Sequence, residues 1–492
     1  MKFRVKDMDI ASGGILIAIL NFKDAQKLDL HSGDRIQLTA GKRKTTCILD
    51  ISKSDKAVPR GKLGLYEKVL EKLRLKNNNP VSLKINGKPK SVKHIREKLY
   101  GKHLNYKEMY HIIDDITNDR LTSIEKTYFV SAGFTHGWSF DEVVNMTKAM
   151  VNTGSKLKFK GITLDKHCIG GVPGNRTTMI VIPIIAAAGF IIPKTSSRAI
   201  TSPAGTADTM ECLAKVELPE KKIKKIVKNI GACIVHGGSM NLAPADDKII
   251  EVEAPLSIDA EGQLLASVMA KKFSVSANHV LIDIPMGPEV KVRNKKEAKR
   301  LKKKFQTLGR ALKMDVKVVI TDGTQPIGNG IGPLLESEDV MAVLRNDPLA
   351  PEDLKEKALD LAGVLLGMCD RCSLRKGRKI AKHLLENGEA LKMMKNIIKA
   401  QGKVKKPFLG KYRRIVRAGK TGKVKAIQNK YIARTARIAG APKDKGAGIY
   451  MEKKVGDRVR KGEKLYTIYS HSDEKLEFAV EFMKNHNPYT IN

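Results

Sequence analysis

The sequence predicts a multidomain α/β protein with a small N-terminal β-barrel, a helical domain, a large α/β domain with a central sheet, and a C-terminal β domain. Three observations support this prediction. The chain has 492 residues, more than one hydrophobic core usually supports. A helix-turn-strand pattern occurs twice near the N-terminus, and apolar strands alternate with helices from Ile162 to about residue 420.

The N-terminal domain is expected at residues 1–86. The segment Lys27–Leu38 (KLDLHSGDRIQL) is echoed by Lys72–Leu83 (KLRLKNNNPVSL). In each copy a short helix ending in Leu-x-Leu leads through a polar turn into an alternating strand. Two such halves resemble the double-psi β-barrels, and nothing in them indicates a catalytic site.

Residues 87–160 are expected to form short helices. Asn105–Glu108 and Ser139–Glu142 have the spacing of capping boxes, which mark helix starts, and Gly154 is a plausible stop. The α/β domain follows at 161–411, with further helices around 242–276. Its clearest buried segments are Met179–Ala188, Val280–Ile284 and Val316–Ile320.

The C-terminal domain is expected at 412–492, where short strands alternate with glycine turns, as in 446–450 and 461–465. This pattern resembles hammerhead-like β domains. The phrase Val-Gly-Asp-x-Val-x-Lys-Gly from Val455 also occurs in biotinyl and lipoyl carriers, but no Met-Lys-Met tip accompanies it. We therefore expect a structural module.

The chain is strongly basic, with 91 Lys and Arg against 52 Asp and Glu and a net charge of +39. Such a surplus attracts anions. The basic residues are spread along the whole chain and aromatic residues make up 5%, so nucleic acid is disfavoured and a small phosphorylated substrate is favoured.

The sequence predicts a cytoplasmic protein that does not associate with membranes. Met1–Lys6 lacks the apolar core of a secretion signal, and the longest apolar run, Met179–Pro193, contains Pro183 and is too short to span a bilayer. Cys369 and Cys372 have metal or redox spacing without a second pair, in a stretch that looks helical from 359 to 374. Packing or an incidental disulfide is favoured there, and no metal is expected.

Two loops carry the chemistry. Asp165–Thr178 (DKHCIGGVPGNRTT) follows a strand and precedes an apolar helix, so its glycines let backbone amides approach an anion while Lys166 adds a full charge. Thr195–Asp208 (TSSRAITSPAGTAD) follows the next strand and concentrates hydroxyls and a guanidinium, which suit phosphate. Side by side, the two loops would form one anion pocket.

These motifs resemble the thymidine phosphorylase family in order and spacing, over about residues 88 to 490. The matching segments are Lys166-His167-x-x-Gly170-Gly171-Val172, Ser196-x-Arg198, Gly205-Thr206-x-Asp208, Leu242–Asp246, Asp259, Ala266-Ser267-x-x-Ala270-Lys271-Lys272 and Asp322-Gly323-x-Gln325-Pro326. The resemblance implies that 242–276 completes the helical domain and that the substrate cleft lies between the helical and α/β domains.

The resemblance also assigns residues. It implies that the attacking phosphate is bound by Lys166, Thr178, Ser196 and Thr206, with Gly171 in the same loop. Ser267 and Lys271 would lie near the nucleobase. Asp259 would be the general acid, although without the resemblance an N-cap would be favoured. His167 adjoins the presumed phosphate site, but loop-ordering histidines are commoner than catalytic ones.

Departures from the family pattern are informative. Pyrimidine-specific members carry an arginine where this chain has Val252, and Cys168 replaces a serine. The family's arginine loop is replaced by Ser197, Arg198, Ala199, Ile200, Thr201 and Ser202. With the N-terminal extension, these changes resemble the archaeal AMP phosphorylase branch.

That branch implies conversion of AMP and phosphate to adenine and ribose 1,5-bisphosphate, with CMP and UMP as further candidates. The remodelled loop 197–202 and Lys291 would supply the second phosphate site. We expect no cofactor beyond inorganic phosphate, which is the co-substrate, and a homodimer or larger homo-oligomer. The alternatives are a thymidine or pyrimidine nucleoside phosphorylase and, outside enzymes, a nucleic-acid-binding protein.

Overall fold

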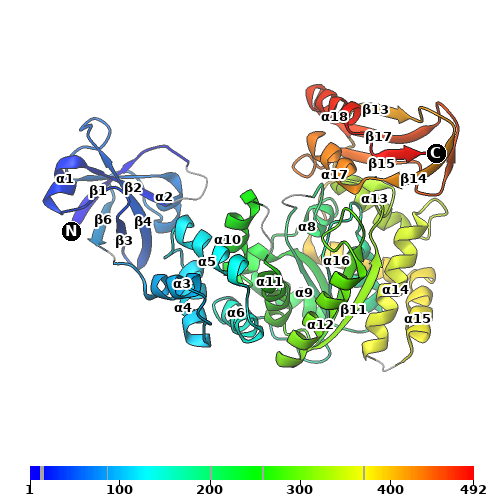
Figure 1. Cartoon of the computed structure of the whole chain (residues 1–492), viewed down its shortest axis with the longest axis horizontal. Coiled ribbons are helices and arrows are strands. Elements are labelled where there is room, and N and C mark those ends of the chain that lie inside the picture. Colours follow the sequence, from blue (N-terminus) through cyan, green and yellow to red (C-terminus); the bar gives the residue numbers. More distant parts are fainter. Residues whose placement is uncertain (12–15, 86, 200–201, 257–259, 370–371) are drawn as a thin grey trace. The chain divides into compact units, whose positions relative to one another are not determined.

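The computed structural model describes residues 1–11, 16–85, 87–199, 202–256, 260–369 and 372–492. It is a multidomain α/β protein that divides into two compact units (Figure 1). Unit 1 comprises Met1–Thr153 and Pro244–Ala266, and unit 2 comprises Gly154–Ala243 and Ser267–Asn492.

A closed barrel of six strands forms the N-terminal part of unit 1, in the order β1-β5-β2-β4-β3-β6. The internal repeat is confirmed, because each copy runs from a short helix into a strand, and Leu38 and Leu83, which end the two copies, are cross-strand partners buried in the barrel. The elements are β1 (Lys2–Asp7), β2 (Ile17–Asn21), α1 (Phe22–Lys27), β3 (Arg35–Ala40), β4 (Arg43–Ser52), β5 (Lys62–Leu65), α2 (Glu67–Leu73) and β6 (Pro80–Ile85).

Short helices make up the rest of unit 1. Both predicted capping boxes are present, at Asn105 and Ser139, and a third begins at Thr122. The elements are α3 (Lys90–Leu99), α4 (Tyr106–Thr117), α5 (Ser123–His136), α6 (Phe140–Asn152), α10 (Pro244–Glu253), the 3-10 turn η2 (Ala254–Leu256) and the start of α11 (Glu261–Ser274).

A parallel sheet organises unit 2. Strand β10 (His279–Met286) pairs with β11 (Asp315–Asp322) and β7 (Leu164–Cys168), while β8 (Ile192–Ser196) pairs with β9 (Ala232–His236). An isolated parallel bridge between Thr163 and Ile191 places β8 beside β7. The loops that follow β7 and β8, which carry the predicted phosphate residues, therefore start from neighbouring strands.

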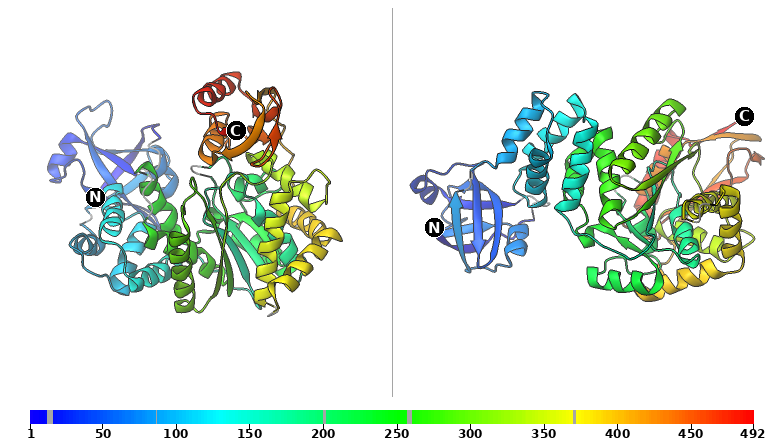
Figure 2. Two further views of the ribbon diagram at one scale, coloured as in Figure 1. Left: turned by 45° about the vertical axis from the view of Figure 1, so that its right-hand side comes forward. Right: turned by 90° about the horizontal axis from the view of Figure 1, so that it is seen from below.

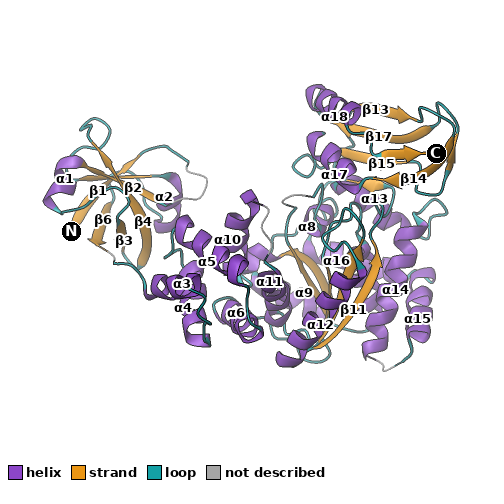
Figure 3. Ribbon diagram, in the orientation of Figure 1, coloured by secondary structure: helices purple, strands orange, loops and turns teal. Residues whose placement is uncertain are grey.

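Helices cover both faces of this sheet (Figures 2 and 3). Residues 280–285 of β10 are all buried, and because successive side chains of a strand point to opposite faces, both faces must be covered. The predicted buried run Met179–Ala188 is mostly helix α7. The helices are α7 (Thr177–Ala187), α8 (Thr206–Met210), α9 (Glu220–Ile230), η1 (Gly237–Met240), α12 (Lys295–Ala311), α13 (Pro333–Leu344), α14 (Glu352–Cys369), α15 (Leu374–Glu386) and α16 (Glu389–Gln401).

The C-terminal part of unit 2 contains two small sheets, β12-β15-β17-β13 and β16-β14-β18. The predicted strands are present, but the structure adds two helices, α17 and α18, that the prediction of short strands and glycine turns omitted. The elements are β12 (Gly330–Ile331), β13 (Tyr412–Arg417), β14 (Gly422–Ile427), α17 (Asn429–Ile438), β15 (Gly448–Met451), β16 (Arg458–Val459), β17 (Lys464–Ser470), α18 (Asp473–Asn485) and β18 (Tyr489–Ile491).

The cysteine segment differs from its predicted continuous helix. Helix α14 ends at Cys369, and α15 begins at Leu374 after Ser373, whose side chain caps it. In the part of the chain that the structure describes, no disulfide joins Cys369 to Cys372. Among the described residues, no helix combines the length and apolar character needed to cross a bilayer.

Candidate active site

The first predicted loop encloses a buried lysine. Lys166 lies on β7 and is fully buried. Its ammonium donates hydrogen bonds to the hydroxyls of Thr177 (2.9 Å) and Thr178 (3.2 Å), which open α7. The Thr177 hydroxyl donates in turn to Asn175 Oδ1 (3.0 Å), and the Asn175 amide donates to Cys168 Sγ (3.3 Å). The predicted pair of Lys166 and Thr178 is therefore in contact at the start of the helix.

Lys166 belongs to a cluster of four buried or nearly buried lysines. Lys194 and Lys272 lie 3.1 and 3.2 Å from the Asp165 carboxylate. Lys166 and Lys357 lie 3.8 and 3.4 Å from Asp283 Oδ2. With every lysine protonated, four ammonium groups face two carboxylates. Buried charge on this scale is relieved either by deprotonation of a lysine or by an anionic ligand, so the cluster is suited to bind an anion.

The electrostatics of the cluster follow from burial. Burial lowers the pKa of Lys166, with Asp283 partly opposing the effect, and burial lowers the pKa of Lys272 to about 7. The pKa of His167 lies well below its ordinary value because burial and then Lys272, Lys194, Lys166 and Lys271 all disfavour imidazolium. His167 is therefore a neutral imidazole at physiological pH.

The second loop is held by Asp208. Its Oδ2 accepts hydrogen bonds from the backbone amides of Ala199 (2.7 Å) and Gly205 (2.9 Å). Gly205 also packs closely on the loop, since a Cβ there would lie 2.9 Å from the Ser197 carbonyl oxygen. Asp208 thus ties Ala199 and Gly205 to the first turn of α8.

Arg198, predicted to bind phosphate, already has carboxylate partners. Its guanidinium donates two 2.8 Å hydrogen bonds to Glu211 and one of 2.8 Å to Glu217. These contacts raise the pKa of Arg198 and lower the pKa of Glu211 to about 2. Lys445 adds a second cation, 2.6 Å from Glu211. In this arrangement Arg198 anchors the loop.

Gly171 and Lys291 lie together. Gly171 has φ of +97°, and a Cβ there would lie 3.0 Å from Val290 Cα and 3.1 Å from the Lys291 amide nitrogen. A side chain at this position would be both strained and crowded. The close approach brings the turn that follows β7 against the segment that carries Lys291.

The comparisons with known proteins cover most of the chain. Residues 92–154 match the helical bundle domain of the glycosyl transferase family, residues 160–391 match its a/b domain, and residues 423–490 match the pyrimidine nucleoside phosphorylase C-terminal domain. The AMP phosphorylase of Methanococcus vannielii is 41% identical over 99% of this chain and 96% of its own length. The chain belongs to the family of the thymidine and AMP phosphorylases.

Other relatives within this phosphorylase family include bacterial proteins. A putative thymidine phosphorylase of Legionella pneumophila (strain Paris) is 44% identical over 92% of this chain and 87% of its own length. The AMP phosphorylase of Methanococcus maripaludis is 42% identical over 99% of this chain and 96% of its own length. The match thus extends through the N-terminal barrel.

A solved structure shares the fold. The anthranilate phosphoribosyltransferase of Thermus thermophilus aligns with a TM-score of 0.53 at 17% identity, over 63% of this chain and 99% of its own. At this identity the likeness concerns the fold alone.

The remaining predicted site residues lie in several parts of the chain. Ser196 ends β8 and Ser202 follows in its loop, where each hydroxyl donates to a nearby backbone carbonyl. Thr206 opens α8 and is buried, while Ser267 and Lys271 lie half-buried on α11. Asp259, Ile200 and Thr201 lie outside the described residues. Their assignments within the phosphorylase family stay predictions.

Several residues of the lysine cluster were not predicted from the sequence. Asp165 and Lys272 lie inside the predicted motifs without an assigned role, and Lys194, Asp283 and Lys357 lie outside those motifs. Lys194 offered a signal, since a lysine within the apolar strand Ile192–Ser196 requires a buried partner. Lys357 offered none, because lysines are common on helix surfaces.

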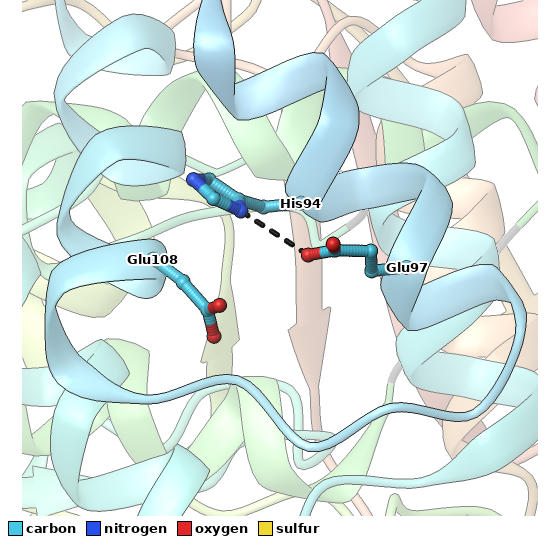
Figure 4. Close-up of side chains that lie close together, drawn as sticks. All are labelled: His94, Glu97 and Glu108. Atoms are coloured by element: carbon cyan, nitrogen blue, oxygen red, sulfur yellow. Dashed lines mark hydrogen bonds and ion pairs between the residues drawn. The ribbon is translucent and has the colours of Figure 1, made fainter.

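One group of three potential metal ligands lies in unit 1, among the described residues. Figure 4 shows His94 and Glu97 on α3 and Glu108 on α4, with their ligand atoms within 4.8 Å of one another. Lys102 donates hydrogen bonds to Glu97 (3.2 Å) and Glu108 (2.9 Å), and Glu108 also accepts from the Asn105 amide. The Lys102 ammonium already pairs with both carboxylates, so the group fits an ion-pair network better than a metal site.

Proposed function

We propose that this protein catalyses phosphorolysis of nucleoside 5′-monophosphates, converting AMP and inorganic phosphate to adenine and ribose 1,5-bisphosphate. One observation supports the chemistry most strongly. Positive charge exceeds negative charge around the Lys166 ammonium, which contacts the two threonines at the start of α7. A buried surplus of this kind suits an anionic co-substrate. The choice of AMP is supported by relatives named AMP phosphorylase, which align over nearly the whole chain.

The reaction breaks the bond between the anomeric carbon and the base nitrogen and forms a bond from that carbon to a phosphate oxygen. By analogy with glycoside hydrolysis, the transition state has oxocarbenium character. Lys166 and Thr178, with Ser196 and Thr206, hold the phosphate anion in place. The departing base takes the bonding electron pair and a proton. No cofactor is required for these steps.

Asp259 is the proposed proton donor. A protonated carboxyl needs a raised pKa, which a cleft closed to water would provide. Asp259→Asn should lower kcat by about 100-fold or more and leave phosphate affinity nearly unchanged. Unchanged turnover in this variant, measured with saturating AMP and phosphate, would remove Asp259 from the mechanism.

The nucleotide's own phosphate needs a second site. The loop from Ser197 to Ser202, together with Lys291, is the proposed location. Because Arg198 is paired with Glu211 and Glu217, its part in this site is to fix the loop. Ser197 and Ser202 are exposed, and their hydroxyls suit direct donation to the nucleotide phosphate, the Ser202 hydroxyl by turning from the Ala204 carbonyl.

A second candidate is phosphorolysis of thymidine or another pyrimidine nucleoside. It is favoured by the Legionella relatives, which are named putative thymidine phosphorylases. Val252, where pyrimidine-specific members have a base-binding arginine, disfavours it.

We further infer a homo-oligomer that works in the cytoplasm.

The test measures free base released from AMP, CMP, UMP, adenosine and thymidine, each with and without inorganic phosphate. Phosphate-dependent release from AMP and not from adenosine is the expected result. Release from thymidine alone would favour the second candidate. Release from none, together with retention of nucleic acid in a gel shift at physiological salt, would favour a nucleic-acid-binding protein.

A further inference from the structure

Asp283 lies between two lysines that approach it from different elements. It stands on β10, where its backbone pairs with Cys168 of β7 and Val319 of β11. Oδ1 accepts a 2.6 Å hydrogen bond from the Thr321 hydroxyl. Oδ2 is 3.8 Å from the Lys166 ammonium and 3.4 Å from that of Lys357, which comes from α14. One carboxylate therefore serves two ammonium groups.

The two lysines differ in the number of hydrogen bonds that their ammonium groups donate. The Lys166 ammonium donates to Thr177 and Thr178, whereas Lys357 Nζ is buried without a hydrogen-bond partner among the described residues. Asp283 Oδ2 likewise has no hydrogen bond there and relies on the two ion pairs. Asp283 is fully buried and the Lys357 Nζ atom is shielded from water, so their charges act on Lys166 with little screening.

We propose that Asp283 and Lys357 are positioning residues for Lys166, which together set the charge that Lys166 presents to the attacking phosphate. This inference rests on the proposed function in one respect, because it takes Lys166 as the phosphate-binding lysine. Asp283 keeps Lys166 protonated in a buried site. Lys357 prevents Asp283 from neutralising Lys166 completely, so a net positive charge remains for the phosphate.

Burial lowers the pKa of Lys166 most, Asp283 raises it, and Lys357 and Lys194 lower it. Burial and Lys194 are the same in the wild type and in each variant. The Cys168 thiol, whose own pKa is raised to about 11, raises the pKa of Lys166 only when it is ionised. A lysine binds phosphate through its protonated form, so affinity is lost as the pH rises through the Lys166 pKa. Substitution of Asp283 and substitution of Lys357 should therefore shift the pH at which phosphate affinity is lost in opposite directions.

The test measures binding of inorganic phosphate by isothermal titration between pH 6 and pH 10. In Asp283→Asn the loss of affinity should move to lower pH by about one unit or more, which is a roughly tenfold weaker affinity on the high-pH side. In Lys357→Met the loss should move to higher pH, while affinity near neutrality falls because one positive charge is gone. The double variant should return toward the wild-type midpoint.

Lys355→Met is the matched control. Lys355 lies on the same helix and pairs with Glu352 at 3.4 Å, away from Asp283, so its removal should leave the pH profile unchanged. Near-ultraviolet circular dichroism of each variant identifies any that fails to fold. The Lys357→Met and control pair still tests the inference if Asp283→Asn is unfolded.

The outcomes separate this inference from the proposed function. Shifts of opposite sign support the positioning role, even if the chain releases no base from AMP. Shifts of the same sign, or none, in a wild type that binds phosphate would overturn the inference and leave the proposed function standing. A wild type that binds no phosphate would overturn both.

Discussion

The buried ammonium of Lys194 lies 3.1 Å from the Asp165 carboxylate and donates a 2.9 Å hydrogen bond to the backbone carbonyl of Lys166. This contact joins β8 to β7 directly beneath the two loops that carry the predicted phosphate residues. Lys272 holds the other oxygen of Asp165 from α11. The spacing of the two loops is thus fixed by charges inside the protein.

Lys194→Met should destabilise the protein by about 3–5 kcal/mol, because it leaves a buried carboxylate and a buried carbonyl short of a partner. Urea unfolding measures the change. Lys228→Met, at an exposed position on α9, is the control and should stay within about 0.5 kcal/mol of the wild type. Equal unfolding midpoints for the two variants would show that the Lys194 contact contributes little.

Arg198 and Glu211 should act as a unit. Replacing either by alanine is expected to raise the KM for AMP by about tenfold, roughly 1.4 kcal/mol, since each loss frees the same loop. The double variant should be no worse than either single variant. A double-mutant cycle on KM measures this coupling. If Arg198→Ala is severe while Glu211→Ala is harmless, Arg198 contacts the nucleotide directly.

The thiol of Cys168 should be unreactive. Burial and the nearby Asp283 raise its pKa to about 11, so the thiolate is scarce at pH 8.5. Alkylation of Cys168 by iodoacetamide, followed by peptide mass spectrometry, should be slower in the folded protein than in the urea-unfolded chain by about 100-fold. Equal rates would mean that the site is open and the thiol ionised.

Glu142 should make unit 1 sensitive to acid. Burial raises its pKa, but hydrogen bonds from Lys98, the Leu104 and Ser139 amides and His103 outweigh this effect and lower it. A carboxyl with a lowered pKa stabilises the fold above its unfolded pKa of about 4.3, and the stabilisation is lost as the pH falls through the folded value.

The variant Glu142→Gln tests this directly. It leaves Lys98 buried without its carboxylate and should cost about 3–5 kcal/mol at pH 7. The difference from the wild type should shrink below pH 4. Trp138, the chain's single tryptophan, stacks under Lys98 at 4.7 Å, so its fluorescence reports the unfolding. A difference that is constant from pH 3 to pH 7 would contradict the assignment.

Local sequence patterns predicted much of the fold. The capping boxes at Asn105 and Ser139 and the alternation of strands and helices each depend on neighbours within a few residues, and the barrel repeat follows from comparing two separate segments of the chain. Helices α17 and α18, of 10 and 13 residues, were missed because each is flanked by strands and turns, so the surrounding pattern dominated. The double-psi description of the N-terminal barrel, the hammerhead description of the C-terminal domain and the domain boundaries stay predictions.

The site was predicted less completely because its charges meet across the sheet. Lys166 and Thr178, a dozen residues apart, were both assigned to phosphate through the motif, and the structure places them in contact. Asp283 and Lys357 reach Lys166 from distant parts of the chain, and neither lies in a motif that marks it. Arg198 was assigned to phosphate from its residue type, and its pairing with Glu211 depends on the fold of the loop.

Phosphorus NMR of the products formed from AMP and inorganic phosphate tests the central claim most directly. Two new phosphomonoester signals of equal intensity are expected, from one ribose that carries phosphate at both ends, with one adenine released for each ribose. Formation of ribose 5-phosphate alone, or unchanged AMP under conditions in which thymidine is cleaved, would contradict it.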